Sequence, residues 1–227
     1  MYMLSDIELM KHHMNVLFKH DAENRMSVVN EPPYEAAPRF FLGVTKYGSE
    51  VSFSYSLALR IVEKLEEIIG TIPSANLGEV IEVLSMDRPV TKLWIGPAYV
   101  FPDVRKMTCT TAIKVTDKNK EILKPHFPHT FENFEYKQPC FVIVEDNIPV
   151  SICCSARQTS KADEASVSTH EHYRGRAYGV NVASAWAAEV QKQGRIALYS
   201  TSWDNFASQS LARKLQLVQY GTDIHMS

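Results

Sequence analysis

A strand–loop–helix–strand order in the C-terminal half constrains the fold of this chain more than any other feature. The run ASVST (165–169) predicts a strand, and a helix is predicted over 177–193, because its apolar side chains recur every three or four residues and Gly194 ends the pattern. A second apolar run, RIALYST (195–201), predicts the next strand. This order implies a crossover connection. The expected fold class is therefore α/β with a mixed sheet.

Apolar runs on either side of this unit predict further elements and two domains. A hairpin is expected over 139–157, because two such runs flank the dipeptide Asp146-Asn147. The other expected helices are 1–20, 54–69, 76–86 and 205–214; the other expected strands are 39–45, 91–96, 111–115 and 217–221, and 96–103 is expected to be a proline-bounded loop. The pattern differs between the two halves. We therefore expect an N-terminal α/β region of unrecognised type over 1–110 and a second domain over 111–227.

Composition and charge exclude several kinds of partner. The formal net charge is −2, whereas nucleic-acid-binding domains usually carry a strong positive charge, so no nucleic-acid partner is expected. No apolar run approaches the roughly 18 residues of a membrane span, and no secretory signal is visible, so we expect a cytoplasmic protein with no membrane partner. The cysteines have no framework spacing and are expected to be reduced, buried thiols. They are Cys109, Cys140, Cys153 and Cys154.

The stretch HEHYRGRAYG (170–179) concentrates positive charge and small residues between the predicted strand and helix. A loop at that place presents unpaired backbone N–H groups and the positive end of the helix dipole, which together bind phosphate. Two familiar phosphate motifs are absent from the sequence, namely G-x-G-x-x-G and Gly-Lys-Ser/Thr. From these ten residues alone, two interpretations stay open: an anion-binding loop and a solvated basic turn that caps the helix.

Two motifs, taken together, resemble a known family. RGRAYG is similar to the R/Q-x-x-G-x-G/A signature of the GNAT superfamily of acetyl-CoA-dependent N-acetyltransferases, and WDNFASQSLARKLQL is similar to the N-x-x-S/A-x-x-L-x-x-K-L-G-F stretch of that family. The two occur in the family's order and separation. STSWDN and SICCSAR also resemble an uncharacterised bacterial subgroup. The resemblance covers residues 111–227 and implies a GNAT-like acyltransferase fold there.

The resemblance implies that acetyl-CoA binds as cosubstrate along the strand and the arginine-rich loop. Val167 and Thr169 would pair with pantetheine through their backbone, and the N–H of Val167 would stabilise the oxyanion. Asn205 and Ser208 match family positions near pantetheine, and Ala177 stands where the family usually has glycine. The residues that would hold the pyrophosphate are Arg174, Gly175, Arg176, Ala177, Tyr178 and Gly179.

The activity implied by the resemblance is transfer of acetyl to a primary amine of a small molecule or peptide by direct attack. The amine needs a proton acceptor. Asp163 and Glu164 precede Val167, and Glu164 is favoured as the base from its strand phase; a solvated acidic pair at a loop end is the alternative. The family's usual acid, a tyrosine, falls at Ala212, which has nothing to donate. A catalytically inactive acyl-CoA-binding or interaction domain is therefore the alternative function.

No metal site is expected. His170 and His172 would face one side of an extended segment, but no third ligand has metal spacing, and His126 and His129 have the same weakness.

The edge of the sheet is a further expectation. The family's sheet normally has one more strand after LVQYG (217–221), so the N-terminal half, or a partner chain as in a homodimer, is expected to cover that edge. Tyr99 and Phe101 would either line a substrate cleft between the halves or cover the core.

Overall fold

The computed structural model describes residues 4–70, 76–106 and 111–227. Its helices are α1 (Asp6–Leu17), α2 (Leu59–Gly70), α3 (Leu77–Ser85), α4 (Pro128–Glu132), α5 (Tyr178–Lys192) and α6 (Phe206–Lys214). Short 3-10 turns are η1 (Lys120–Leu123), η2 (Phe134–Tyr136) and η3 (Glu171–Tyr173). The strands are β1 (Phe18–His20), β2 (Met26–Val29), β3 (Phe40–Thr45), β4 (Gly48–Phe53), β5 (Leu93–Val100), β6 (Ile113–Val115), β7 (Cys140–Glu145), β8 (Ile148–Gln158), β9 (Ala162–Thr169), β10 (Ile196–Ser200) and β11 (Val218–Met226).

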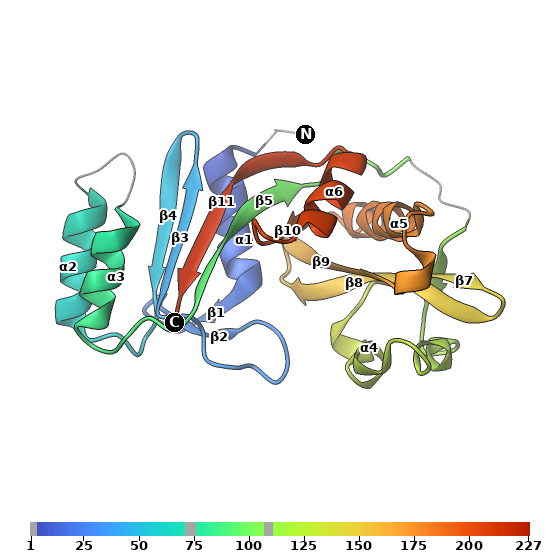
Figure 1. Ribbon diagram of the computed structural model, residues 1–227, viewed down its shortest axis with the longest axis horizontal. Coiled ribbons are helices and arrows are strands. Elements are labelled where there is room, and N and C mark those ends of the chain that lie inside the picture. The colour runs from blue at the N-terminus through green and yellow to red at the C-terminus, as the bar shows by residue number, and fades with distance from the viewer. Residues whose placement is uncertain (1–3, 71–75, 107–110) are drawn as a thin grey trace.

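One long sheet organises the described part of the chain. Its nine strands follow the order β4-β3-β11-β5-β10-β9-β8-β7-β6, and β1 and β2 form a separate small sheet. β9 and β10 are parallel, whereas the other neighbours in the long sheet are antiparallel. Figure 1 shows α2 and α3 beside β3 and β4, and α5 and α6 over the other half of the sheet, with α1 behind the middle of it. The mixed α/β fold predicted from the sequence is confirmed.

The predicted hairpin of residues 139–157 is confirmed as β7 and β8. Asp146 and Asn147 form its two-residue turn with φ values of 49° and 65°. Both residues lie in the left-handed region, which the favoured type I′ hairpin turn requires and which asparagine and aspartate tolerate better than other side chains. The local chemistry of these two residues therefore determines where β7 ends and β8 begins.

The predicted end of a strand at Gly96 is wrong, because β5 continues to Val100 through the Gly96-Pro97 pair. A Cβ atom at Gly96 would overlap the carbonyl oxygen of Thr201, so this glycine allows two backbones to approach closely and does not make a turn. Pro97 lacks an N–H, but its carbonyl oxygen accepts a hydrogen bond from the Thr201 N–H at 3.4 Å. The Gly96-Pro97 pair therefore lies inside a strand that another backbone segment approaches closely, and it does not end that strand.

Two further boundaries differ from the prediction. The helix expected over 54–69 begins at Leu59, and β4 precedes it as a strand that was not predicted. The helix expected over 1–20 ends at Leu17, and the chain turns directly into β1. Residues 55–58 form a turn before α2 with Leu57 buried, and Phe18 packs in the core from β1, so apolar periodicity alone did not mark where these two helices begin or end.

The C-terminal strand lies among strands from the N-terminal half. β11 pairs with β3 through Ile224 and Leu42 and with β5 through Ile224 and Ile95. It also extends the strand predicted over 217–221 as far as Met226. β5 in turn lies between β11 and β10. The sheet edge at β11, which we expected the N-terminal half or a partner chain to cover, is thus covered by β3 and β5 of the same chain.

The cysteine prediction is confirmed for the thiols that the structure describes. Cys140, Cys153 and Cys154 are free and buried, and burial raises the pKa of the Cys154 thiol to about 11. Cys109 lies outside the described residues. Among the helices of the described ranges, none has the length and apolarity that would let it cross a membrane.

Candidate functional site

The sheet opens between β9 and β10. Their parallel pairing runs from Ile196 opposite Ala162 to Leu198 opposite Glu164 and goes no further. Beyond that point β9 continues to Thr169 beside β8, while β10 continues beside β5. The two strands therefore diverge after Glu164 and leave one edge of β9 open.

The backbone of β9 aims two N–H groups into this opening. The His170 N–H donates to the Val150 carbonyl of β8 at 2.9 Å, and at the closed end the Ile196 N–H donates to the Lys161 carbonyl of the β9 side at 2.9 Å. Peptide groups alternate sides along a strand. The N–H groups of Val167 and Thr169 consequently face away from β8 and toward the opening.

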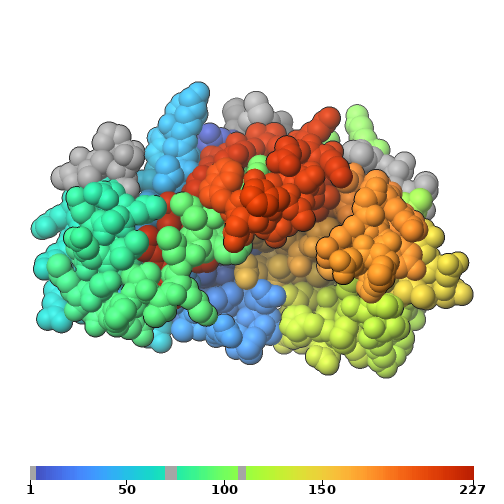
Figure 2. Space-filling model, in the orientation of Figure 1, coloured from blue at the N-terminus to red at the C-terminus, as the bar shows by residue number. Residues whose placement is uncertain are grey.

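The arginine-rich loop lies at the end of the opening and leads into α5. Gly175 and Ala177 have φ values of 82° and 62°, so the loop enters the left-handed region twice before α5 begins. Ala177 is the N-cap of α5 and makes no side-chain cap bond. A Cβ on Gly179 would lie 3.4 Å from Thr169 Oγ1 and 3.8 Å from Val167 Cγ1, so the start of α5 sits against the open end of β9. In Figure 2 a shallow recess separates this loop, in orange, from α6, in red.

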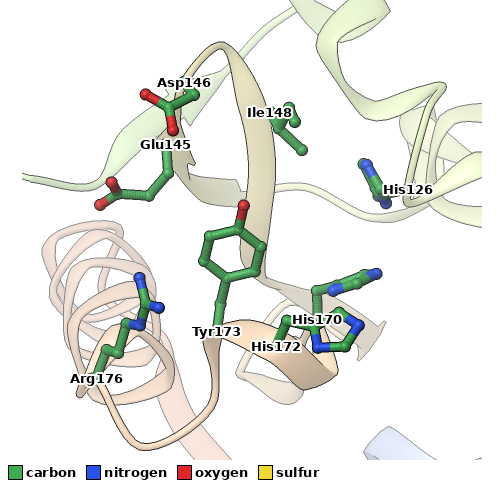
Figure 3. Close-up of a pocket in the computed structure, with 8 residues that line it drawn as sticks. All are labelled: His126, Glu145, Asp146, Ile148, His170, His172, Tyr173 and Arg176. Atoms are coloured by element: carbon green, nitrogen blue, oxygen red, sulfur yellow. The ribbon is translucent and has the colours of Figure 1, made fainter.

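The two arginines of the loop meet different neighbours. Arg174 Nε donates to the Thr169 carbonyl at 3.3 Å, on the open edge of β9. The guanidinium of Arg176 lies 5.2 Å from the ring centre of Tyr173 and points toward Glu145 (Figure 3). A hydrogen bond from the Tyr178 hydroxyl to Glu145, 2.6 Å long, raises the pKa of that hydroxyl. The negative charge of Glu145 therefore offsets the charge of Arg176 more than that of Arg174.

The start of α6 forms the other wall. Asn205 Oδ1 accepts from the Ser208 N–H at 3.1 Å, so the asparagine caps the helix. Burial raises the pKa of Tyr199, and its hydrogen bond with Ser208 opposes that shift. Ala212 is 1% exposed and packs in the core, so the position of the family's tyrosine offers no proton donor to the opening.

Asp163 and Glu164 lie on opposite faces of β9. Asp163 is fully buried, accepts from Ser155 at 2.7 Å and pairs with Arg195; burial raises the pKa of its carboxyl to about 6, although both partners lower it. Glu164 is 4% exposed and accepts a hydrogen bond from the hydroxyl of Ser200, where β9 and β10 separate. The alternative of a solvated acidic pair at a loop end is wrong, because both residues are buried within a strand.

Comparison with known proteins identifies the family. The family model described as GNAT acetyltransferase matches residues 99–220, more than half of the chain. The chain belongs to the GNAT acetyltransferase family. No protein of curated function matches it in sequence.

Solved structures agree with this GNAT assignment at the level of the fold. A protein assigned to the GNAT family from Novosphingobium aromaticivorans DSM 12444 is 12% identical, with a TM-score of 0.52 over 60% of this chain and 65% of that one. A GNAT-family acetyltransferase from Colwellia psychrerythraea is 8% identical, with a TM-score of 0.50 over 78% of this chain and 75% of that one. This chain thus covers just under two thirds of the Novosphingobium protein.

A separate hollow lies beside the GNAT loop, away from the opening between β9 and β10. It has a volume of about 510 Å³ and is lined by His126, Glu145, Asp146, Ile148, His170, His172, Tyr173 and Arg176 (Figure 3). The ring centres of His126 and His170 are 5.1 Å apart, and those of His170 and His172 are 5.6 Å apart. Nothing in the spacing of the histidines along the sequence indicated that His126 lies beside His170. Within the described ranges no three side chains of His, Cys, Asp or Glu are arranged to hold a metal ion.

Sequence reasoning also missed the residues that surround Glu164. His13 of α1 lies between two carboxylates, with Nε2 3.3 Å from Asp223 Oδ2 and Nδ1 4.0 Å from Glu164 Oε2. The one signal available was a histidine on the apolar stripe of the predicted first helix. Phe101 covers the core, whereas Tyr99 is half-buried and stacks on Tyr199 at 6.5 Å.

Proposed function

We propose that this chain transfers an acetyl group from acetyl-CoA to a primary amine of a small molecule or a peptide. The observation that carries the proposal is the convergence of two features on one opening: the N–H of Val167 aimed into it and the start of α5 beside it, without a side-chain cap. Peptide N–H groups stabilise the oxyanion of acyl transfer, and helix N-termini bind phosphate. The thioester carbonyl of acyl-CoA and its pyrophosphate therefore each have a group of the protein that can bind them.

In this proposal CoA lies along the open edge of β9. Its pantetheine arm pairs with the backbone of Val167 and Thr169, and its pyrophosphate meets the N–H groups at the start of α5. Arg174, which bonds the Thr169 carbonyl in this structure, moves its donor to a phosphate oxygen. Asn205 and Ser208 border the pantetheine from the side of α6.

The acceptor amine attacks the thioester carbonyl while the N–H of Val167 bonds the forming oxyanion. A proton leaves the attacking nitrogen for the hydroxyl of Ser200, which passes its own proton to Glu164 through the hydrogen bond already present. The C–S bond then breaks, and the thiolate leaves. A thiol with a pKa near 8.5 is a tolerable leaving group, so water protonates it without a donor at Ala212.

The test is an assay of acetyl-CoA with a panel of amines, following free thiol release and product mass. The wild type is expected to acetylate at least one amine, and Glu164→Gln is expected to lower kcat about 100-fold or more while the CoA dissociation constant stays within about twofold. Glu121→Gln, an exposed carboxylate change on η1, is the matched control and should leave both values unchanged.

The buried alanine at position 212 favours a second function, a catalytically inactive acyl-CoA-binding domain. In that case calorimetry detects CoA binding, but no amine of the panel is acetylated and Glu164→Gln changes nothing. That pair of results would reject the transferase proposal and retain the binding site.

A further inference from the structure

Four polar side chains from three elements meet in the core below the closed end of the opening. They are His13 of α1, Glu164 of β9, and Tyr220 and Asp223 of β11, with exposures of 0%, 4%, 3% and 1%. We call these four residues the buried cluster. His13 lies between the carboxylates, 3.3 Å from Asp223 and 4.0 Å from Glu164, and its ring packs edge-on against Tyr220 with ring centres 6.2 Å apart.

The buried cluster lowers the stability of the fold, and packing of the core alone does not require it. Each member has a buried polar atom without a hydrogen-bond partner among the described residues: His13 Nδ1, Glu164 Oε2, Tyr220 Oη and Asp223 Oδ1. An unsatisfied buried polar atom costs about 1–3 kcal/mol, and apolar replacement of a buried ionic group is often neutral or stabilising. The neighbours on the same stripe of α1 are apolar, namely Leu9, Met10, Val16 and Leu17.

The charges of the buried cluster favour a protonated imidazole. Burial by itself lowers the pKa of His13, but Glu164 and Asp223 outweigh it, so the pKa is raised. The pKa of His225 is lowered to about 4 by burial, so this second imidazole is neutral at pH 7. The charged and titratable groups that face His13 from the elements around it are Arg157 on β8, Glu164 on β9, and Tyr220, Asp223 and His225 on β11.

We propose that His13 and Asp223 are positioning residues for Glu164: the imidazolium of His13, anchored by Asp223, supplies a buried positive charge beside the carboxylate and holds it against Ser200 at the opening. The inference rests on the proposed function, in which Glu164 is the base. It assigns the first helix of the N-terminal half a part in the chemistry of the GNAT half.

The consequence concerns the pH range of the reaction. A carboxylate accepts a proton from an attacking amine only in its ionised form, and a positive charge at about 4 Å favours that form. Without the imidazolium, the carboxylates of Glu164 and Asp223 would lie in the core with no positive charge between them, which disfavours the ionised form. His13 therefore extends the working range of the base toward acid.

The first test compares the pH dependence of kcat in the wild type, His13→Gln and the control His12→Gln, a change at the neighbouring position that is not in the buried cluster. Because kcat reports ionisations of the substrate complex, titration of the free amine does not contribute. We expect the acid limb to move up by about one pH unit or more in His13→Gln and to stay in place in His12→Gln. An equal loss at every pH, with no movement of the limb, means a merely structural role and overturns the proposal.

A second measurement does not depend on activity. The titration of the His13 imidazole is followed by NMR in the full chain and in Glu164→Gln. The midpoint is expected above 6.5 in the wild type and lower in the variant, since one of the two carboxylate charges beside the imidazole is gone. An unchanged His13 midpoint in Glu164→Gln overturns the proposal. This measurement does not require that His13→Gln folds. A wild type that acetylates nothing while His13 still follows Glu164 counts against the proposed function and leaves the coupling intact.

Discussion

Arg174 and Arg176 carry the same charge two positions apart, yet their surroundings differ. Arg174 reaches the open edge of β9, whereas Arg176 stacks on Tyr173 and faces Glu145. The pair predicted from sequence as one unit is therefore expected to act unequally on an anion at the start of α5.

Charge reversal at these two positions tests that inequality. Arg174→Glu is expected to weaken CoA binding by about tenfold or more, and Arg176→Glu by less, because Glu145 already offsets Arg176. The double variant is expected to lose at least about 2 kcal/mol through lost and reversed charge-assisted contacts. Calorimetry with CoA measures all three, and Lys192→Glu, at the far end of α5, is the control. Unchanged affinity in the double variant would remove the site from this loop.

At the scale of elements, β5 depends on the absence of a side chain at one position. Gly96→Ala is expected to lower the free energy of unfolding by about 3 kcal/mol, because the new Cβ would overlap the carbonyl oxygen of Thr201 and force the loop after β10 away. Urea unfolding measures the loss.

The control for that change is Gly194→Ala. Gly194 has a φ of 78° and no atom within 4 Å of an added Cβ, so only backbone strain of about 1 kcal/mol is expected. Equal losses in the two variants would show that Gly96 is not crowded by Thr201.

β11 gives the fold a pH dependence through His225, which stacks on Trp94 with ring centres 5.6 Å apart. Burial lowers the pKa of His225 from 6.5 to about 4. The unfolded chain therefore binds a proton between these values that the folded chain does not, and stability is lost as pH falls from 6.5 toward 4. We expect a contribution of about 2 kcal/mol, absent from His225→Phe, measured by urea unfolding at pH 7 and pH 4.5. Parallel pH slopes in the two proteins would contradict this assignment.

Elements whose signals are local were predicted from the sequence. The helix expected over 177–193 is α5, and the hairpin turn lies at Asp146-Asn147, because periodicity and turn chemistry decide both within a few residues. The second half of β5 was missed, since its Gly-Pro pair reads as a turn and only pairing with β10 and β11 makes it a strand.

For the candidate site too, residues with a local sequence signal were proposed from the sequence, whereas a residue defined by a long-range contact was missed. The loop residues were proposed from a motif that is continuous in sequence and Glu164 from its strand phase, and their roles stay predictions. His13 was missed because its partner Asp223 lies 210 positions away, and no pattern within α1 indicates that contact.

The whole molecule depends on strands that the two halves share. β11 of the C-terminal half lies between β3 and β5 of the N-terminal half, and β5 lies between β11 and β10 of the C-terminal half. Glu31 of the N-terminal half also pairs with Arg157 and Lys137 beyond residue 111. Neither half completes its sheet alone.

Thermal unfolding is therefore expected to be a single transition, with calorimetric and van't Hoff enthalpies that agree. A fragment of residues 1–110 lacks β11 and is expected to give no cooperative transition of its own. Two separate transitions, or a fragment 1–110 that unfolds cooperatively, would show that the halves are independent folding units.

Because β11 lies between β3 and β5, the facing edges of these two strands stay unpaired during synthesis until β11 has been made (Figure 1). β3 and β5 are translated first, and β11 begins more than a hundred residues after β5 ends. At roughly 5–20 residues per second, the nascent chain exposes the facing edges of these two strands for about 6 to 24 seconds before the strand that joins them exists. Unpaired edges pair with other chains. A ribosome-bound chaperone that covers apolar nascent segments should therefore raise the yield of this protein more than that of one whose strands pair in the order in which they are made.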